Sequence, residues 1–404
     1  MQTNQRPSDS EREIAFGANL PPIPERLLLA HARGEVLFIC GAGVSMPANL
    51  PDFRRLVIEV YEHLDTGVHT VLEKVDRLRP SLEGIDCADL TASQLAEALR
   101  FVKGDYDVVL GMLERRLDNQ TDRGSQVRQT TIDLIRARAK QPAPIHKALM
   151  RLANRGGATA IVTTNFDRLL EIAGRRIGAG VESYALGSIP RPMRHTDWSG
   201  VMHIHGMIDP SPKRHSELVI SDQDFGEFYL RRRAIPDFIY DAARLYHLVL
   251  VGYSANDPPM RYLLNAVAAD GQRFDDLKER FTFFGTEQSD PVALEDWKAR
   301  HITPIPYSDH AGHQSLCDVL ERWADLSAIN GDPARVEREI RRIVKRGWNS
   351  ADDADRDLFA HLFRRGNPKE RAKLAALTSQ SGADIEWLNV IAQACDDKAQ
   401  GGRS

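Results

Sequence analysis

The sequence predicts an α/β fold in which a doubly wound, mostly parallel sheet carries a helical insertion and is followed by a small all-helical C-terminal tail. Three observations support this prediction. The run Val36–Cys40 is apolar throughout, as expected for a strand buried on both faces. A glycine turn, Gly41-Ala42-Gly43, follows it directly. From residue 145 onward, short apolar runs alternate with segments of helical spacing.

The glycine turn predicts a nucleotide site. Glycines at the carboxyl end of a parallel strand let the backbone approach a ligand closely, and the amides of the turn suit a pyrophosphate. A turn used for packing alone is the alternative. The third glycine of the dinucleotide-binding pattern GxGxxG is missing, and residues 56–64 have helical spacing. Glu59 and Glu62 are therefore expected on a solvated helix face. An ordinary dehydrogenase would instead have an acidic residue in this region at the end of a second strand, where it binds the ribose.

The first part of the chain is expected to be mostly helical. Residues 1–20 read as a flexible arm, and Glu25–Ala32 as a helix that leads into the first strand. No convincing strand follows between the glycine turn and about residue 140. We interpret residues 65–140 as a helical insertion that forms a lid or an oligomer surface.

Strands resume after the insertion and alternate with helices, which is the pattern of a Rossmann-like sheet. Ligands of such sheets lie at the carboxyl ends of the strands. Strands are predicted at residues 160–164, 200–205, 248–251, 281–284 and 302–305, and helices at residues 145–152, 166–173, 258–268 and 313–323.

The character of the chain changes near residue 330. Asp332-Pro333 is a helix start, residues 334–346 form a charged helix closed by Gly347, and Ser350 and Asn367-Pro368 open two more helical pieces. The predicted domains are thus residues 21–329 for the nucleotide-binding domain and residues 330–404 for a helical C-terminal domain.

Composition excludes several classes of protein. A net charge of −4 and a pI near 6.4 argue against strong nucleic-acid binding through the phosphate backbone. No apolar run is long enough for a membrane span and the polar N-terminus is no signal peptide, so a cytoplasmic protein is expected. The four cysteines form no CxxC pair, which argues against a thiolate zinc site or a disulfide framework.

Three predicted strands end in residues suited to ligand contact. The first ends in Thr164-Asn165-Phe166-Asp167, the second in His205-Gly206, and the third in Gly252-Tyr253-Ser254. Each also has an ordinary structural explanation. Asn165 or Asp167 can cap the following helix, His205 can be a core or surface histidine, and Gly252 can serve a tight turn.

The order of these features decides between the alternatives. GAGVS, PDFR, TTNFD, HG and GYS follow one another at strand ends. This set resembles the sirtuin superfamily, and specifically its bacterial SIR2-like branch, over roughly residues 28–325. The helical insertion fits the smaller helical module of that fold.

The resemblance implies that NAD+ is the ligand and that each motif contacts a different part of the NAD+ molecule. The glycine turn with Ser45 holds the pyrophosphate, and Phe53 and Arg54 lie in a flexible loop over the nicotinamide. Gly252 and Ser254 meet the adenosine end. The implied NAD-binding residues are Ala42, Gly43, Ser45, Asp52, Phe53, Arg54, Thr164, Asp167, Gly252 and Ser254.

By the same resemblance, Asn165 and Asp167 lie beside the nicotinamide ribose and His205 is the catalytic histidine. Asn165 and His205 are thus the predicted catalytic residues. Cleaving the bond to nicotinamide creates an oxocarbenium-like centre, so a base for water or a ribose hydroxyl and a neutral orienting group are needed. Histidine supplies the first near pH 7, and an asparagine amide supplies the second without adding charge.

The chain departs from the protein-deacylating sirtuins, which carry two zinc-binding CxxC pairs beside the acyl-peptide groove. No zinc is therefore expected, and water is the simplest acceptor. The resemblance implies an NAD+ hydrolase that acts as the NAD-depleting effector of antiphage defence, forms homo-oligomers and works with a HerA-type ATPase. The alternatives are an NAD-dependent deacylase or ADP-ribosyltransferase, a non-catalytic sensor of NAD or ADP-ribose, and a nuclease subunit.

Overall fold

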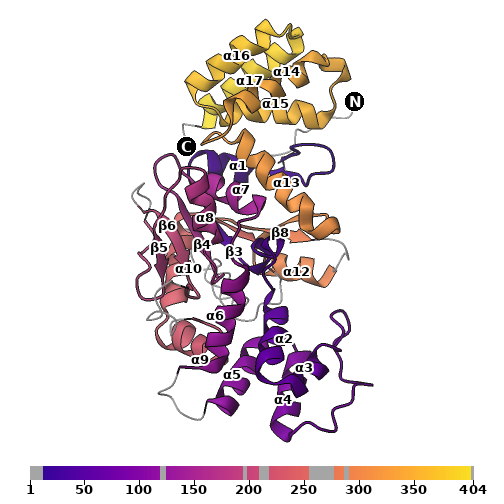
Figure 1. The fold of residues 1–404 in the computed structure, drawn as a ribbon. Coiled ribbons are helices and arrows are strands. Elements are labelled where there is room, and N and C mark those ends of the chain that lie inside the picture. The colour runs from indigo at the N-terminus through magenta and orange to yellow at the C-terminus, as the bar shows by residue number, and fades with distance from the viewer. Residues whose placement is uncertain are drawn as a thin grey trace.

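The computed structural model describes residues 12–118, 124–193, 198–208, 218–253, 277–285 and 291–401. Figure 1 shows three parts along the molecule. The C-terminal helices form one end, the sheet with its covering helices lies in the middle, and the helical insertion forms the other end. The predicted α/β class is confirmed.

The seven-stranded sheet is parallel throughout and has the order β5-β6-β4-β3-β7-β8-β9. The chain starts at the central strand β3, builds one half of the sheet from β4 outward, and then returns to the other side of β3 at β7. This reversal opens a crevice at the carboxyl ends of the strands beside β3. The strands are β3 (Val36–Cys40), β4 (Ala160–Thr163), β5 (Ser183–Ala185), β6 (Gly200–His203), β7 (His247–Val251), β8 (Arg280–Gly285) and β9 (Ile302–Tyr307).

The strands predicted from apolar runs are all present, with ends that shift by two residues or fewer. Edge strand β5 was not predicted, because its three residues are too short to show a period. It is recognisable only by its pairing with β6.

The pleat of β3 explains its uninterrupted apolar sequence. Val36, Phe38 and Cys40 belong to a core shared with α1, α7, α8 and α13, whereas Leu37 and Ile39 pack into a second core with α10 and α12. Both faces are therefore buried, as expected for a central parallel strand. These helices are α1 (Glu25–Ala32), α7 (Pro144–Ala153), α8 (Leu169–Arg176), α10 (Ala234–Leu245), α12 (Pro291–Ala299) and α13 (His310–Leu326). The predicted helix at residues 258–268 lies outside the described residues.

The insertion is a helical module with its own apolar core. A buried polar network crosses it, in which Glu97 accepts hydrogen bonds from Tyr61 (2.8 Å) and Arg116 (2.8 Å). The short helix α9 (Asp222–Phe225) joins the module to the sheet domain through Arg128 and Asp224, whose Nη2 and Oδ1 atoms are 2.6 Å apart. The module consists of α2 (Phe53–Leu64), α3 (Thr66–Leu72), α4 (Ala92–Val102), α5 (Tyr106–Leu117) and α6 (Gln126–Arg138).

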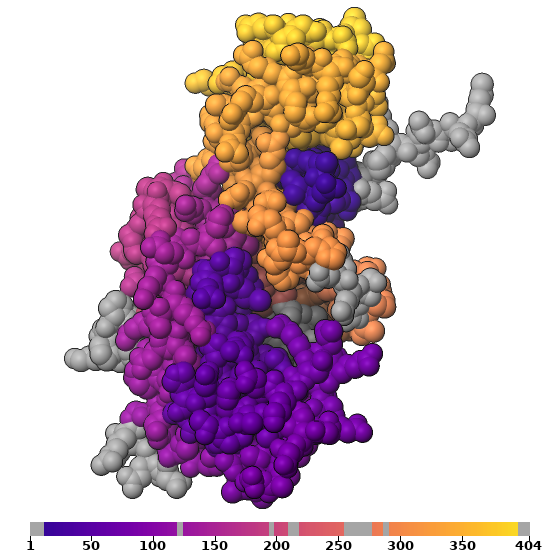
Figure 2. Space-filling view, turned by 45° about the vertical axis from the view of Figure 1, so that its right-hand side comes forward, coloured from indigo at the N-terminus to yellow at the C-terminus, as the bar shows by residue number. Residues whose placement is uncertain are grey.

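The C-terminal helices lie against the N-terminal part of the described chain (Figure 2). Glu25 of α1 accepts hydrogen bonds from His361 (2.9 Å) and Arg364 (2.8 Å) of α15. Burial by itself raises the pKa of Glu25, but the hydrogen bonds and charges of these two partners outweigh it and lower that pKa to about 2. The C-terminal helices are α14 (Pro333–Lys345), α15 (Asp353–Arg365), α16 (Pro368–Gln380) and α17 (Ile385–Gly401).

The segment predicted as an arm, residues 1–20, is described from Arg12 onward. There β1 (Glu13–Ile14) pairs antiparallel with β2 (Ile23–Pro24), and Ile14 and Phe16 are buried. Within the described ranges, no helix has both the length and the apolar composition that crossing a membrane requires.

Three glycines form the contact between the turns that follow β3 and β7. A Cβ atom on Gly41 would lie 2.6 Å from the Gly252 carbonyl oxygen, and one on Gly43 would lie 2.8 Å from the Gly252 Cα. Gly252 has a φ of +73°, and its own Cβ would lie 2.6 Å from the Val44 nitrogen. The Gly43 N–H donates to the Gly252 carbonyl (3.0 Å). Any side chain at these positions would separate the two turns.

Replacing Gly252 by Ala should therefore destabilise the protein more than the left-handed backbone alone explains. Gly178 is a matched control, because its φ is +77° and no atom lies within 4 Å of a Cβ placed there. We expect Gly178→Ala to lower the free energy of unfolding by about 1–2 kcal/mol, and Gly252→Ala by about 1–3 kcal/mol more. Chemical denaturation of both variants measures this; equal losses would contradict the close approach of the two turns.

Candidate functional site

A cleft of about 490 Å³ opens where the strands beside β3 end. It lies between the sheet and the helical module, since residues of both line it. Every predicted site residue within the described chain lines this cleft, and Ser254 lies outside the described residues. The predicted residues found here are Ala42, Gly43, Ser45, Asp52, Phe53, Arg54, Thr164, Asn165, Asp167, His205 and Gly252.

The Ser45 hydroxyl connects three of the polar groups at the cleft. It donates to Oδ2 of Asp167 (2.8 Å) and accepts a hydrogen bond from Nδ2 of Asn165 (3.0 Å). The other carboxylate oxygen of Asp167 accepts from the backbone N–H of Leu169 (2.9 Å) at the start of α8. Both Ser45 and Asp167 are buried. Asp167 thus anchors the start of α8, as the structural alternative proposed, and also fixes Ser45.

His146 of α7 completes this network from behind the cleft. Its Nδ1 accepts from the backbone N–H of Ala143 (3.2 Å), so Nε2 carries the proton of the neutral ring and faces the Ser45 hydroxyl at 3.4 Å. Burial lowers the pKa of His146, although the charge of Asp167 opposes the shift. A neutral imidazole therefore donates towards Ser45.

Asn165 has a single orientation imposed by two hydrogen bonds. Its Nδ2 donates to the Gly41 carbonyl and to the Ser45 hydroxyl, each at 3.0 Å. Its backbone N–H donates to the Thr163 hydroxyl (3.0 Å). With both amide protons used, the Asn165 side chain offers its carbonyl oxygen to a ligand, as an acceptor for a hydroxyl or a water molecule.

A buried ion pair lies behind Asn165. His203 donates from Nδ1 to the Asn165 backbone carbonyl (2.9 Å), and its Nε2 lies 2.9 Å from Oε1 of Glu171. Burial disfavours the charged form of His203, but the Glu171 carboxylate outweighs it and raises the pKa of His203. Burial likewise raises the pKa of Glu171, and the charge and hydrogen bond of His203, with a hydrogen bond from Ser183, overcome this and lower it. The pair is therefore ionised and holds the backbone of Asn165 in place.

His205 has a different environment. It is 6% exposed, and its Nε2 lies 2.6 Å from the Tyr229 hydroxyl. The rings of Phe225 and Tyr229 meet its ring edge-on, with centroids 5.6 and 5.9 Å away. Burial lowers the pKa of His205 to about 3. This histidine is thus neutral at pH 7, unlike His203 two residues before it.

Asp52, Phe53 and Arg54 line the rim of the cleft, but not in a loop. Phe53 and Arg54 form the first turn of α2, and Asp52 caps that helix by accepting the Arg55 backbone N–H (2.7 Å). Asp52 also pairs with Arg77 at 2.7 Å, and Arg54 donates to the Val75 carbonyl at 2.6 Å. The prediction of a flexible loop is wrong here because the N-cap and these contacts fix the segment to the helical module.

The structure adds cleft residues to the predicted set. Tyr253, which the sequence placed at a strand end without assigning it a role, has its hydroxyl 3.0 Å from that of Thr164. On another wall the Tyr307 hydroxyl lies 2.9 Å from Nδ1 of His313, whose φ of 65° is unusual for a residue other than glycine. Tyr307 ends β9, so its position at the carboxyl end of a strand could have identified it as a cleft residue. His313 has no such signal, because it comes to the cleft through the non-helical break at residues 311–313 inside α13.

Comparisons with known proteins relate part of the chain to a known domain family. Residues 159–305 match the model of the SIR2-like domain, from just before β4 into β9. The chain is also 32% identical over 369 residues to the uncharacterised protein y4cA of Sinorhizobium fredii (strain NBRC 101917 / NGR234). That alignment takes in 85% of this chain and 28% of the relative, so the chain spans little more than a quarter of that protein's length.

The His203–Glu171 pair should make stability depend on pH. Because the pKa of His203 is raised in the fold, its protonation contributes stability that is fully present below the ordinary pKa of 6.5. This contribution is lost as the pH rises through the raised pKa of His203. Because the pKa of Glu171 is lowered in the fold, its ionisation contributes stability that is fully present above the ordinary pKa of 4.5. This contribution is lost as the pH falls through the lowered pKa of Glu171. The contribution is therefore greatest between pH 4.5 and 6.5.

Glu171→Gln should lower the free energy of unfolding by about 3–5 kcal/mol within that range, because it leaves a buried charge unpaired. The loss should be smaller at about pH 9, because the charge of the histidine is lost as the pH rises through its raised pKa. Denaturant unfolding of wild type and variant at both pH values measures the difference. Glu227, the partly exposed partner of Arg231, provides a control, since Glu227→Gln should change the free energy of unfolding little at either pH. A loss that does not vary with pH would show that the pair is not ionised.

Proposed function

Residues 159–305 of this chain form a SIR2-like domain, and from this premise we propose that the protein is an NAD+ hydrolase. It cleaves the bond between nicotinamide and ribose and releases nicotinamide and ADP-ribose. The observation that supports this proposal best is the pairing of a fixed amide, Asn165, with a neutral histidine, His205, in one cleft at the point where the sheet reverses.

The reaction needs few groups from the protein. The bond between ribose C1′ and nicotinamide N1 breaks, and its electron pair passes to the positively charged ring, which leaves as neutral nicotinamide. A water oxygen bonds to C1′ and loses a proton. NAD+ and water thus give ADP-ribose, nicotinamide and one proton. The enzyme has to orient the water and accept that proton.

Asn165 is suited to the first of these tasks. Two hydrogen bonds fix its amide, and its carbonyl oxygen remains to hold the water or a ribose hydroxyl. The charged group that keeps its backbone in place, His203, lies behind the strand and is buried. The amide can therefore be positioned rigidly without placing a charge next to the reacting carbon.

His205 is suited to the second task. Because burial keeps it neutral at pH 7, it accepts a proton without first having to lose one. We assign it the role of general base, with Tyr229 orienting its ring through the 2.6 Å contact.

The biological role is proposed on the resemblance in motif order. The chain has no CxxC pair for the zinc module of deacylating sirtuins, which favours water over an acyl-lysine as acceptor. We propose an NAD-depleting effector of antiphage defence that acts in the cytoplasm, where its substrate is abundant, as a homo-oligomer with a HerA-type ATPase. Release of free ADP-ribose without any added acceptor would argue against a deacylase or an ADP-ribosyltransferase.

One observation favours a second function. The Nε2 atom of His205 already contacts Tyr229 and its ring is closed in by aromatic side chains, which suits a binding role as well as a base. A non-catalytic sensor would use the same cleft to bind NAD+ or ADP-ribose without turnover. Binding without nicotinamide release, with and without the ATPase partner, would identify the sensor.

Replacing either proposed catalytic residue should abolish turnover while NAD+ binding largely remains. We expect Asn165→Ala and His205→Ala each to lower kcat by at least about 100-fold, the lower range for acid–base groups. Loss of NAD+ and appearance of nicotinamide and ADP-ribose are followed with purified protein, with and without the partner. His63→Ala, an exposed histidine on α2, is the control. Wild-type activity in His205→Ala would remove that residue from the base role.

The pH profile tests the environment of His205 separately. Because its pKa in the free protein is about 3, kcat/KM should not fall when the pH is lowered from 6.5 to about 5. A base with the ordinary histidine pKa of 6.5 would lose most of its activity over this range. A falling acid limb centred near that value would contradict the assigned role.

A further inference from the structure

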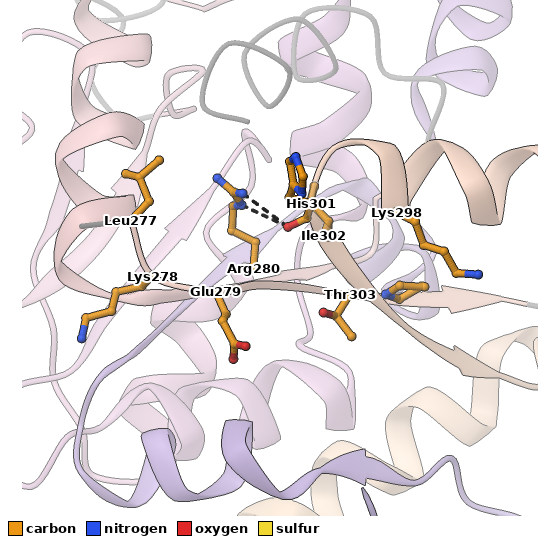
Figure 3. A pocket seen from close by; sticks show the side chains of 9 residues that line it. Leu277, Lys278, Glu279, Arg280, Lys298, His301, Ile302 and Thr303 are labelled. Atoms are coloured by element: carbon orange, nitrogen blue, oxygen red, sulfur yellow. Dashed lines mark hydrogen bonds between the residues drawn. The ribbon is translucent and has the colours of Figure 1, made fainter. Parts of the chain in front are cut away.

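A second pocket lies at the opposite edge of the sheet from the cleft. It has a volume of about 540 Å³ and lies where β8 and β9 begin (Figure 3). None of its described lining residues lines the cleft. The lining combines apolar side chains with several cationic ones: Leu277, Lys278, Glu279, Arg280, Lys298, His301, Ile302, Thr303 and Pro304.

Arg280 is the central feature of this pocket. It is the first residue of β8 and is 6% exposed. Its Nε and Nη2 atoms donate to the His301 carbonyl at 3.4 and 3.3 Å, whereas Nη1 is buried without a hydrogen-bond partner. Among the described residues, no carboxylate forms an ion pair with it. A buried guanidinium without a counter-ion is unfavourable, and burial accordingly lowers the pKa of Arg280.

The acidic residue in the described lining does not neutralise this charge. Glu279 comes directly before β8, and Figure 3 shows its side chain projecting to the opposite side from that of Arg280. The Glu279 carboxylate is held by Arg26, with Nε 3.1 Å from both of its oxygens. Arg280 therefore needs an anion from elsewhere.

Other basic side chains line the pocket farther from the Arg280 guanidinium (Figure 3). Lys278 and His301 line it from the starts of the two strands, and Lys298 lines it from α12. Lys298 pairs with Glu295 at 2.8 Å, but both side chains are exposed, so that this contact is readily exchanged. The positive groups thus outnumber the one acidic side chain in the described lining.

We propose that this pocket binds a small ligand that carries a phosphate group, with Arg280 as its principal contact. The planar guanidinium presents paired donors to phosphate oxygens, and the neighbouring cations favour an anion with more than one negative charge. Leu277, Ile302 and Pro304 supply an apolar wall for the remainder of the ligand. The volume is in the range of small-molecule sites, and the net charge of −4 disfavours a nucleic-acid backbone.

The position of the pocket makes this site independent of the cleft. Strand β9 runs from Ile302 at the pocket to Tyr307 at the cleft, a span of six residues or roughly 20 Å. The two ligands therefore occupy opposite ends of the same strands. Because Asn165 lies at the far end, its substitution leaves the second site intact.

Isothermal titration of the full chain with inorganic phosphate at low ionic strength tests the proposal. We expect one phosphate site that binds more tightly than acetate does, and Arg280→Met should weaken it at least about tenfold because the charged donors are lost. Ser45→Ala, which changes the predicted pyrophosphate contact in the cleft, and Asn165→Ala should both bind phosphate as wild type does. Arg231→Met, which removes a charge from a side chain that is 78% exposed, controls for net charge.

Each result bears on the proposal. Unchanged phosphate binding in Arg280→Met would overturn it, as would loss of binding in Ser45→Ala, which would place the phosphate in the cleft. Acetate binding as tight as phosphate would contradict the phosphate assignment. If Arg280→Met does not fold, two measurements replace it: phosphate binding by Lys278→Ala, and the rise in Tm that phosphate produces in the wild type. A rise in Tm that chloride reproduces at equal ionic strength would overturn the proposed site.

Discussion

The contact between the turns that follow β3 and β7 is the constraint on which the cleft depends. Gly41 and Gly43 meet Gly252 so closely that no Cβ atom fits on any of the three. The hydrogen bond from the Gly43 N–H to the Gly252 carbonyl closes the contact. Because two strand ends are brought together here, the polar residues that follow the neighbouring strands converge on one cleft. A side chain at this point would move the turns apart and with them Asn165, whose amide is bonded to the Gly41 carbonyl.

The polar network around the cleft holds its uncharged amide through buried charged groups. Asp167 and the His203–Glu171 pair are buried, and each acts on the cleft through a neutral neighbour. Ser45, which is hydrogen-bonded to the Asp167 carboxylate, accepts a hydrogen bond from the Asn165 amide. The ring of His203 donates a hydrogen bond to the Asn165 backbone carbonyl. In a medium of low dielectric constant such hydrogen bonds are strong, and unpaired groups are costly. The arrangement thus gives rigid positioning to an uncharged amide.

The two edges of the sheet differ in electrostatic character. At the carboxyl edge, His205 is neutral because burial opposes its charge. At the amino edge, Arg280 keeps a charge that the described residues do not balance. The first edge suits the departure of a cationic leaving group as a neutral molecule, and the second suits an anion. Strands β8 and β9 join these edges directly, so that any coupling between two ligands would pass through a rigid, buried part of the fold.

The sequence by itself determined all strands of the parallel sheet but the short edge strand β5, and part of the cleft lining. Both depend on local patterns: apolar runs give buried strands, and polar residues directly after parallel strands must lie at one edge. Only the tertiary structure brought His146 to Ser45, 101 positions earlier in the chain, and Tyr229 to His205. It also decided that Arg280 is buried beside the His301 carbonyl. Such contacts leave no period or motif in the sequence, because they depend on how distant helices and strand ends pack together.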